Sequence, residues 1–172
     1  LEGALGGLEG GTSLVFASGM AAVTAVLMTV CKPGDKLVAV HDGYPGVRFV
    51  ALQRPPGAAV CCTPTPTTAL FPALEGARLV WIETPSNPGL DVCDVRRLAR
   101  AAHAAGALVA CDNTLETPLG QRPLELGADF SVASDTKGMT GHGDILLGHV
   151  TCRDTGLAAG VRRWRKLAGA IP

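Results

Sequence analysis

The chain has 172 residues, of which 47% are hydrophobic and 17% are charged, a composition typical of a globular protein with a sizeable core rather than of a disordered one. Its 15 basic and 15 acidic residues balance, so there is no positive surplus with which to bind nucleic acids or anionic membranes. Every apolar run is interrupted by Gly, Pro or a charged residue before the ~20 residues that a membrane span needs, which excludes a transmembrane segment.

Short apolar runs rich in β-branched residues alternate along the chain with Ala-rich segments of helical period. This alternation is typical of repeated β-α units around a mostly parallel sheet. Seven strands are predicted, at residues 14–16, 36–40, 58–61, 78–83, 107–111, 130–134 and 145–150. The Pro/Thr-rich residues 62–68 are predicted to be a surface connection, because each Pro removes a backbone donor.

Three helices are predicted, at residues 19–30, 44–52 and 94–105, the last with Asp94 as its N-cap. The fold class that follows is a three-layer α/β/α arrangement with a mostly parallel seven-stranded sheet. The Gly-rich opening LEGALGGLEGG has neither the G-x-G-x-x-G spacing nor the preceding strand of a dinucleotide site.

The six cysteines are scattered, with no C-x-x-C pair and no His at zinc-finger spacing, so we expect no metal site. Several lie in apolar runs, where a free Cys behaves as a small hydrophobe, and a reducing cytoplasm is the expected location. The chain begins with neither an initiator Met nor a signal-peptide layout, which predicts a piece of a longer protein.

Ligands of open α/β sheets bind at the carboxyl ends of the strands, and five polar clusters follow the predicted strands there. They are Ser18-Gly19-Met20, Asp42-Gly43-Tyr44, Glu83 to Pro88, Asp112-Asn113-Thr114 and Ser134 to Lys137. Each alone has an ordinary structural explanation, since Ser-Gly begins helices, Asn-Pro makes turns and an isolated Lys is commonly a solvated charge. Their order along the chain makes them informative.

That order resembles the cysteine and methionine metabolism family of pyridoxal 5'-phosphate (PLP) enzymes, which includes cystathionine synthases and lyases and methionine γ-lyase. The motifs are LEGG-x4-F-x-SGMAA, KPGD, Y-x-G, ETPSNP, DNT and S-x-TK-x3-GH-x-D, and they extend from about Leu8 to about Val150. The resemblance implies the large domain of PLP fold type I, with PLP as the cofactor.

In such a site, the resemblance makes Lys137 the catalytic residue that forms the Schiff base with the cofactor. Lys137 must lose a proton to attack an aldehyde, and its small or hydroxylic neighbours favour this role over that of a solvated surface charge. Asp112 matches the carboxylate that pairs with the pyridine nitrogen and keeps it protonated. A helix cap or a turn is the alternative for Asp112.

The other predicted site residues bind the remaining parts of the cofactor. Ser18, Gly19 and Met20 open a helix whose free N–H groups and dipole suit a phosphate. The hydroxyls of Ser134 and Thr136 match the family's remaining phosphate donors, and Thr114 completes the DNT motif among the cofactor-binding residues.

Tyr44, the single tyrosine of the chain, matches the family residue that stacks on the cofactor ring, and we count it as catalytic as well as cofactor-binding. A core tyrosine is the alternative. Asn87 matches the residue that contacts the 3-oxygen of the cofactor. Glu83 is expected to be structural, and Arg48 and His142 are expected to be solvated or structural.

The chain departs from the family in length and beside the lysine. Family members are about twice as long, so residues 1–172 are predicted to be the PLP-binding large domain, lacking the N-terminal arm and the C-terminal domain that carries the carboxylate-binding Arg. Gly138-Met139-Thr140 stands where the family often has Tyr-Leu-Asn, and Pro45 stands in its Y-G-G motif. Both changes predict an altered substrate pocket, with more space over the lysine.

The predicted function is a PLP-dependent carbon–sulfur lyase that releases a thiol from cysteine or a cysteine S-conjugate by β-elimination, alone or as a domain of a larger synthase. The alternatives are γ-elimination or replacement, as in methionine γ-lyase or cystathionine γ-synthase, and a non-catalytic scaffold. An aminotransferase is disfavoured by the S-x-TK and ETPSNP motifs. The expected partners are a sulfur amino acid, further copies in a homodimer or tetramer, and neighbouring synthase domains, with no nucleic acid or membrane.

Overall fold

Seven strands form one sheet in the computed structural model, which describes residues 1–53 and 61–172. The strands are β1 (Thr12–Phe16), β2 (Lys36–Val40), β3 (Cys61–Thr65), β4 (Ala77–Glu83), β5 (Leu108–Asp112), β6 (Phe130–Ala133) and β7 (Gly148–Cys152). Their order is β1-β7-β6-β5-β4-β2-β3, and only the pairings of β7 are antiparallel. The predicted mostly parallel α/β sheet is confirmed.

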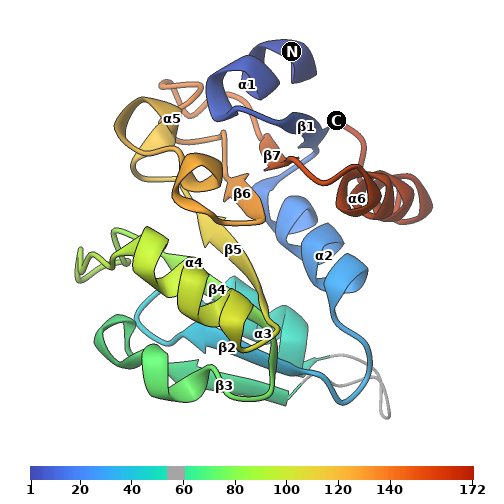
Figure 1. The fold of residues 1–172 in the computed structure, drawn as a ribbon. Helices are drawn as coiled ribbons and strands as arrows, with labels where there is room; N and C mark the ends of the chain where they lie inside the picture. The colour runs from blue at the N-terminus through green and yellow to red at the C-terminus, as the bar shows by residue number, and fades with distance from the viewer. Residues whose placement is uncertain (54–60) are drawn as a thin grey trace.

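Helices cover both faces of this sheet (Figure 1). They are α1 (Glu2–Glu9), α2 (Gly19–Val30), α3 (Gly46–Leu52), α4 (Val95–Ala104), α5 (Thr117–Gly120) and α6 (Thr155–Leu167), with short 3-10 helices at Thr67–Ala69, Phe71–Ala73 and Pro123–Leu126. The helices α2, α3 and α6 pack on one face, and α4 packs on the other. Among the residues that the structure describes, no helix is long and apolar enough to cross a membrane.

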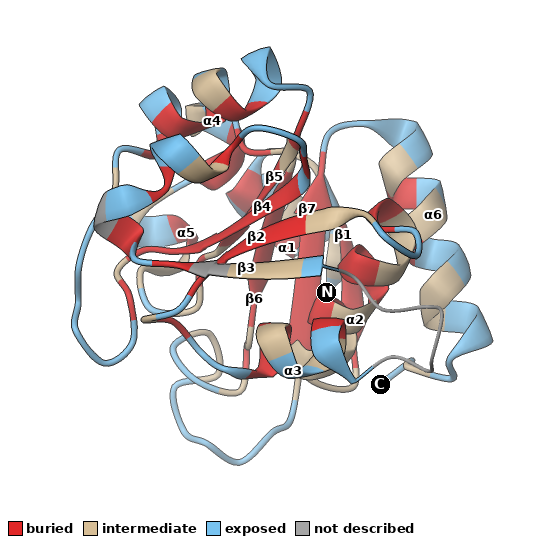
Figure 2. Ribbon diagram, turned by 90° about the horizontal axis from the view of Figure 1, so that it is seen from below, coloured by how far each residue is buried: buried red, intermediate tan, exposed pale blue. Residues whose placement is uncertain are grey.

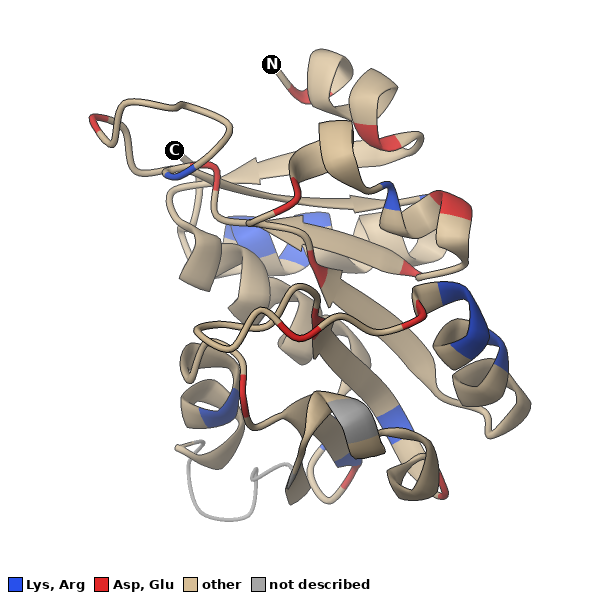
Figure 3. Cartoon of the chain, turned by 90° about the vertical axis from the view of Figure 1, so that its left-hand side faces the viewer, with Lys and Arg blue, Asp and Glu red and all other residues tan. Residues whose placement is uncertain are grey.

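The core lies on both sides of the sheet because successive strand residues point to opposite faces. In β4, Leu79 and Trp81 pack toward α2, whereas Val80 and Ile82 pack toward α4. All four side chains are at most 1% exposed. The strands are mostly buried, whereas the helices that cover them have one buried and one exposed side (Figure 2). Lys and Arg lie mainly on the helices (Figure 3). Burial on both faces explains why these strands read as continuous apolar runs.

The predicted helix at residues 19–30 matches α2, and the helix at 94–105 matches α4 within one residue at each end. The Asp94 side chain accepts the backbone N–H of Arg97, which confirms it as the N-cap. The helix predicted from residue 44 begins at Gly46, because Pro45 takes the N-cap position.

Two strand predictions are corrected by the structure. The predicted connection at residues 62–68 is largely β3, in which Pro64 pairs with Ala39. Pro is tolerated there because β3 is the edge of the sheet and needs backbone donors on one side alone. Residues 58–60 of the predicted third strand lie outside the described residues. The last strand is Gly148–Cys152 rather than 145–150, because Leu147 is held by Thr136 in a loop.

Candidate functional site

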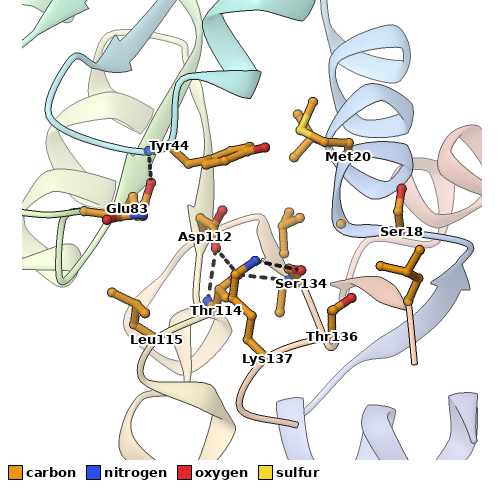
Figure 4. A pocket seen from close by; sticks show the side chains of 16 residues that line it. Ser18, Met20, Tyr44, Glu83, Asp112, Thr114, Leu115, Ser134, Thr136 and Lys137 are labelled. Atoms are coloured by element: carbon orange, nitrogen blue, oxygen red, sulfur yellow. Dashed lines mark hydrogen bonds between the residues drawn. The ribbon is translucent and has the colours of Figure 1, made fainter. Parts of the chain in front are cut away.

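The carboxyl ends of the parallel strands meet at one edge of the sheet, beside a cavity of about 200 Å³. Glu83 at the end of β4 lies opposite Asp112 at the end of β5, and Asp112 lies opposite Val132 of β6. The ten residues that the sequence predicts in the site all line this cavity (Figure 4): Ser18, Gly19, Met20, Tyr44, Asn87, Asp112, Thr114, Ser134, Thr136 and Lys137.

Asp112 is held by Thr114, two residues further along the chain. Asp112 Oδ1 accepts the Thr114 backbone N–H at 3.0 Å and the Thr114 hydroxyl at 2.6 Å. In the described part of the chain, both side-chain hydrogen bonds of Asp112 go to Oδ1, which leaves Oδ2 able to accept from a ligand. Burial raises the pKa of Asp112, and the Thr114 bonds and the positive charges of Lys137 and His149 oppose that rise. A cationic N–H group bound at Oδ2 would favour the ionised carboxylate in the same way as these two charges do.

Lys137 lies in the turn that follows β6, and its side chain returns toward the strand end. Its Nζ donates to Ser134 Oγ at 3.2 Å, and its backbone N donates to the Ser134 carbonyl at 3.2 Å. The residue is exposed and lines the cavity, so a ligand can reach the amine. The site therefore holds an amine and a carboxylate whose charges interact.

The helix α2 begins at the cavity, with Ser18 as its N-cap. Ser18 Oγ accepts the backbone N–H of Ala21 at 3.1 Å. The first N–H groups of a helix have no partner within it, so those of Gly19 and Met20 are available to an anion. A Cβ on Gly19 would lie 2.8 Å from Ser134 Cβ. Glycine thus allows the start of α2 to approach the end of β6.

Thr136 is tied to Leu147 across the loop that precedes β7. The Thr136 hydroxyl donates to the Leu147 carbonyl at 3.1 Å and accepts the Leu147 N–H at 3.0 Å. The backbone N–H of Thr136 also donates to the Leu147 carbonyl, at 3.2 Å. If the Thr136 hydroxyl turned toward an anion in the cavity, the Leu147 carbonyl would still accept a hydrogen bond from the Thr136 backbone N–H.

Tyr44 and Glu83 form another wall of the cavity. Glu83 Oε2 accepts the backbone N–H of Tyr44 at 2.5 Å, and Tyr44 is 46% exposed. Burial raises the pKa of Glu83 to about 7, helped by the negative charges of Asp112 and Asp42. Glu83 holds Tyr44, as the expected structural role requires, but it also lines the cavity, which the sequence analysis did not predict.

Asn87 and Met20 lie at the margins of the cavity. Asn87 is exposed, and its backbone N–H donates to the Asp42 carbonyl at 3.1 Å. Met20 borders both the cavity and an apolar groove that continues along α2. Arg48 donates to the Val40 carbonyl at 2.7 Å, which agrees with the expected structural role.

Some cavity residues were missed by the sequence analysis, because apolar residues near strand ends look like core residues. They are Val23, Leu115, Val132, Ala133 and Leu146. A second missed group lies behind the cavity, where the buried His149 contacts Asp135 and Glu9. The sequence could have indicated this group, because Asp135 and His149 are ionisable residues within runs of apolar and small residues.

Gly138 does not open space over the lysine. A Cβ at this position would lie 2.9 Å from Thr117 Cγ2. Close packing against α5 therefore favours a residue without a side chain here. Gly138, Met139 and Thr140 are not among the cavity-lining residues. The predicted enlargement of the pocket at this point is therefore not found.

The donor set of the cavity fits PLP. A phosphate needs several N–H and O–H donors, and these are present at the start of α2 and on Ser18, Ser134 and Thr136. A protonated pyridine nitrogen needs an acceptor, and Asp112 Oδ2 is available as one. An aldehyde needs an amine, which Lys137 supplies.

Comparisons with known proteins agree with this chemistry. A family model described as "Cys/Met metabolism PLP-dependent enzyme" matches residues 1–172. The chain is 61% identical to a putative cystathionine gamma-lyase of Streptomyces coelicolor, over all of this chain and 45% of that protein. It thus spans about half the length of this curated relative.

Two solved structures are similar in fold. One is the cystathionine gamma-lyase CalE6 of Micromonospora echinospora, with a TM-score of 0.87 and 42% identity over 99% of this chain and 46% of that one. The other is cystathionine gamma-synthase of Xanthomonas oryzae in complex with cystathionine, with a TM-score of 0.90 and 39% identity over 99% of this chain and 45% of that one.

Proposed function

Because the chain belongs to the Cys/Met metabolism PLP-dependent enzyme family, we propose that it is the cofactor-binding part of a carbon–sulfur lyase acting on a sulfur amino acid. One observation carries this proposal. Asp112, Lys137 and the donor groups at the start of α2 lie around a single cavity, in an arrangement that meets each functional group of PLP.

PLP, when bound, supplies an electron sink that stabilises negative charge on the substrate Cα. Lys137 Nζ would hold the cofactor covalently, and the amine, once displaced by the amino group of the substrate, would accept the Cα proton. Ser134 Oγ is 3.2 Å from Nζ and orients the amine. At the end of the neighbouring strand β5, Asp112 Oδ2 would accept a hydrogen bond from the protonated ring nitrogen, because a carboxylate favours the cationic form of a nearby base.

The remaining residues bind and cover the cofactor. Ser18, Ser134 and Thr136 donate to the phosphate together with the N–H groups that begin α2. Tyr44 covers the ring, an aromatic contact worth about 0.5–1.5 kcal/mol. Asn87, at the exposed margin, donates to the 3-oxygen. The proposed substrate is a small sulfur amino acid. We also propose that the protein forms a homo-oligomer.

The bond that is cleaved distinguishes two candidate reactions that share these residues. A larger pocket beside Lys137, predicted from the sequence, would suit a bulky cysteine S-conjugate and its β-elimination. In the structure, Gly138 instead packs closely against Thr117. γ-Cleavage of cystathionine is favoured by the 61% identity to a putative cystathionine gamma-lyase. We therefore place γ-cleavage first and β-elimination second.

Product analysis of the full-length protein with PLP and cystathionine tests this assignment. γ-Cleavage yields cysteine, 2-oxobutyrate and ammonia, whereas β-cleavage yields homocysteine, pyruvate and ammonia. A parallel reaction with cysteine tests for β-elimination, which would yield hydrogen sulfide, pyruvate and ammonia. If the protein takes up PLP but yields no keto acid from either substrate, the scaffold alternative replaces the lyase. A keto acid that keeps its side chain would indicate an aminotransferase.

A further inference from the structure

A buried cluster of three ionisable side chains lies directly behind the proposed cofactor site. His149, on β7, contacts Asp135 through Nδ1 at 2.7 Å and Glu9, the last residue of α1, through Nε2 at 3.1 Å. His149 and Glu9 are 0% exposed and Asp135 is 1% exposed. None of the three lines the cavity.

The geometry of the cluster indicates that the imidazole of His149 is charged. A neutral imidazole has one N–H donor and one lone pair, so it could donate to only one of the two carboxylates. An imidazolium donates to both Asp135 Oδ1 and Glu9 Oε1. The two hydrogen bonds and the negative charges of these carboxylates raise the pKa of His149 to about 9, against the opposing effect of burial. A buried cation between two acids satisfies both contacts.

The cluster is connected to the site through a short segment of backbone. Asp135 stands between Ser134 and Thr136, and Lys137 follows. The Ser134 N–H is held from the other side by the Thr114 hydroxyl at 2.9 Å. The Asp135 side chain therefore points away from the cavity into the cluster while its neighbours point into it.

We propose that the imidazolium of His149 is a positioning group of the site: through Asp135 it sets the orientation of the segment that carries Lys137. This inference rests on the proposed PLP function. Glu9 anchors the imidazolium to α1, so the segment is connected to a helix as well as to the sheet. Without the imidazolium, the Asp135 carboxylate has no donor within the cluster, so the segment loses the one side-chain contact that orients it from behind the cavity.

Two oxygens of the cluster without hydrogen-bond partners indicate that the carboxylates of Asp135 and Glu9 depend on the imidazolium of His149. Asp135 Oδ2 and Glu9 Oε2 are buried without a hydrogen-bond partner among the described residues. Each carboxylate therefore relies on one oxygen and on the shared imidazolium. Loss of the imidazolium leaves two buried acids uncompensated, which is the costly state.

The positive charge also reaches the cofactor site itself. The charge of His149 lowers the pKa of Asp112, which burial raises. The charge of Lys137 acts on the pKa of Asp112 in the same direction. The same imidazolium thus supports both the orientation of the lysine segment and the charge of the proposed partner of the ring nitrogen.

Two variants of the full-length protein test the proposal through PLP affinity, measured by titration of the cofactor. His149→Leu is expected to weaken PLP binding at least tenfold. Because two unpaired acids could prevent folding, the triple variant Glu9→Gln, Asp135→Ala, His149→Leu removes all three charges. It is expected to fold and still to bind PLP at least tenfold more weakly than wild type. PLP affinity of the triple variant within twofold of wild type would overturn the proposal.

Thr151 provides the matched control on the same strand. Its hydroxyl shares a buried hydrogen bond of 2.5 Å with Ser13 Oγ and touches no part of the cluster in the described hydrogen bonds. Thr151→Val is expected to lower the stability of the protein but to leave PLP affinity within twofold of wild type. If Thr151→Val weakens PLP binding as much as His149→Leu does, general damage explains the effect and the proposal is wrong.

Nitrogen-15 NMR of the cofactor-free protein gives a readout independent of PLP. At pH 7 both ring nitrogens of His149 are expected to carry a proton, and the amide resonances of Ser134 to Lys137 are expected to move in His149→Leu. A neutral ring, or unmoved amides, would refute the positioning role. If wild type binds no PLP, the proposed function fails, and these two NMR results alone then decide the positioning role.

Discussion

Asp112 and Ser134 are joined by one hydroxyl group, that of Thr114. The hydroxyl donates to Asp112 Oδ1 at 2.6 Å and accepts the Ser134 N–H at 2.9 Å. The hydroxyl therefore uses its donor toward the end of β5 and one of its two lone pairs toward the end of β6. The distance between the proposed ring-nitrogen partner and the proposed phosphate donor is set by this bridge.

Thr114→Val keeps the shape of the side chain and removes the bridge. The Ser134 N–H loses its acceptor, and a lost buried hydrogen bond costs about 1–3 kcal/mol. We expect both lower stability and about tenfold weaker PLP binding, measured by denaturant unfolding and cofactor titration. Thr114→Ser keeps the hydroxyl and should stay close to wild type. Equal loss in both variants would show that the methyl group, not the bridge, matters.

Gly19→Ala should separate the start of α2 from the end of β6. The new Cβ would meet Ser134 Cβ at 2.8 Å, a clash that typically costs 1–3 kcal/mol. PLP affinity should fall with stability, because both walls contribute phosphate donors. Gly3→Ala in α1 is the matched control, since its Cβ meets nothing within 4 Å and Ala favours a helix by about 1 kcal/mol. Unchanged PLP affinity in Gly19→Ala would contradict the proposed close approach.

Ser18→Ala should separate capping from cofactor binding. The substitution removes the N-cap of α2 and should lower stability by about 1 kcal/mol. Asp154→Ala removes the equivalent N-cap of α6, whose side chain accepts the Leu157 N–H at 2.8 Å, with a similar loss. PLP affinity should fall only in Ser18→Ala. A similar fall in both variants would mean that the loss of a helix cap, rather than the loss of a phosphate donor, lowers the PLP affinity.

Glu83 should make the cofactor-free protein less stable as the pH rises. Its pKa is about 7 in the folded protein against an ordinary value of 4.5, so the folded state holds the proton more tightly. The stabilisation is complete below pH 4.5 and is lost as the pH rises through 7, by about 2–3 kcal/mol. Glu83→Gln, which still accepts from Tyr44 N, should make this decline smaller in unfolding experiments at pH 5 and pH 8. The decline that remains is expected from His149, whose pKa is raised to about 9.

The exposed Glu75 is the control for this pH dependence. Glu75→Gln should keep the decline in stability between pH 5 and pH 8. If Glu83→Gln declines as steeply as wild type, another group is responsible.

The sheet and its ligand edge were predictable because they depend on local patterns. Strand burial on both faces gives apolar runs, and the residues after those runs, such as Asp112 and Lys137, fall at the edge where ligands bind. Asp94 was recognised as an N-cap because the Asp side chain itself makes the capping bond. These features need no knowledge of distant contacts.

The parts that were missed depend on tertiary neighbours. The helix α1 is rich in Gly, which disfavours a helix, and is held instead by packing and by the bond from Val15 N to Glu2. Pro64 fits a strand only because β3 is at the edge. The contact between His149 and Glu9 spans 140 positions in sequence, so no local pattern could indicate it.

The central claim is that Lys137 holds the cofactor covalently, and borohydride reduction followed by peptide mass spectrometry tests it most directly. The full-length protein is incubated with PLP, reduced and digested. A phosphopyridoxyl group on the Lys137 peptide of wild type, and its absence in the same peptide of Lys137→Ala, is the predicted result. A wild-type protein that carries the group on another lysine, or on none, would contradict the account.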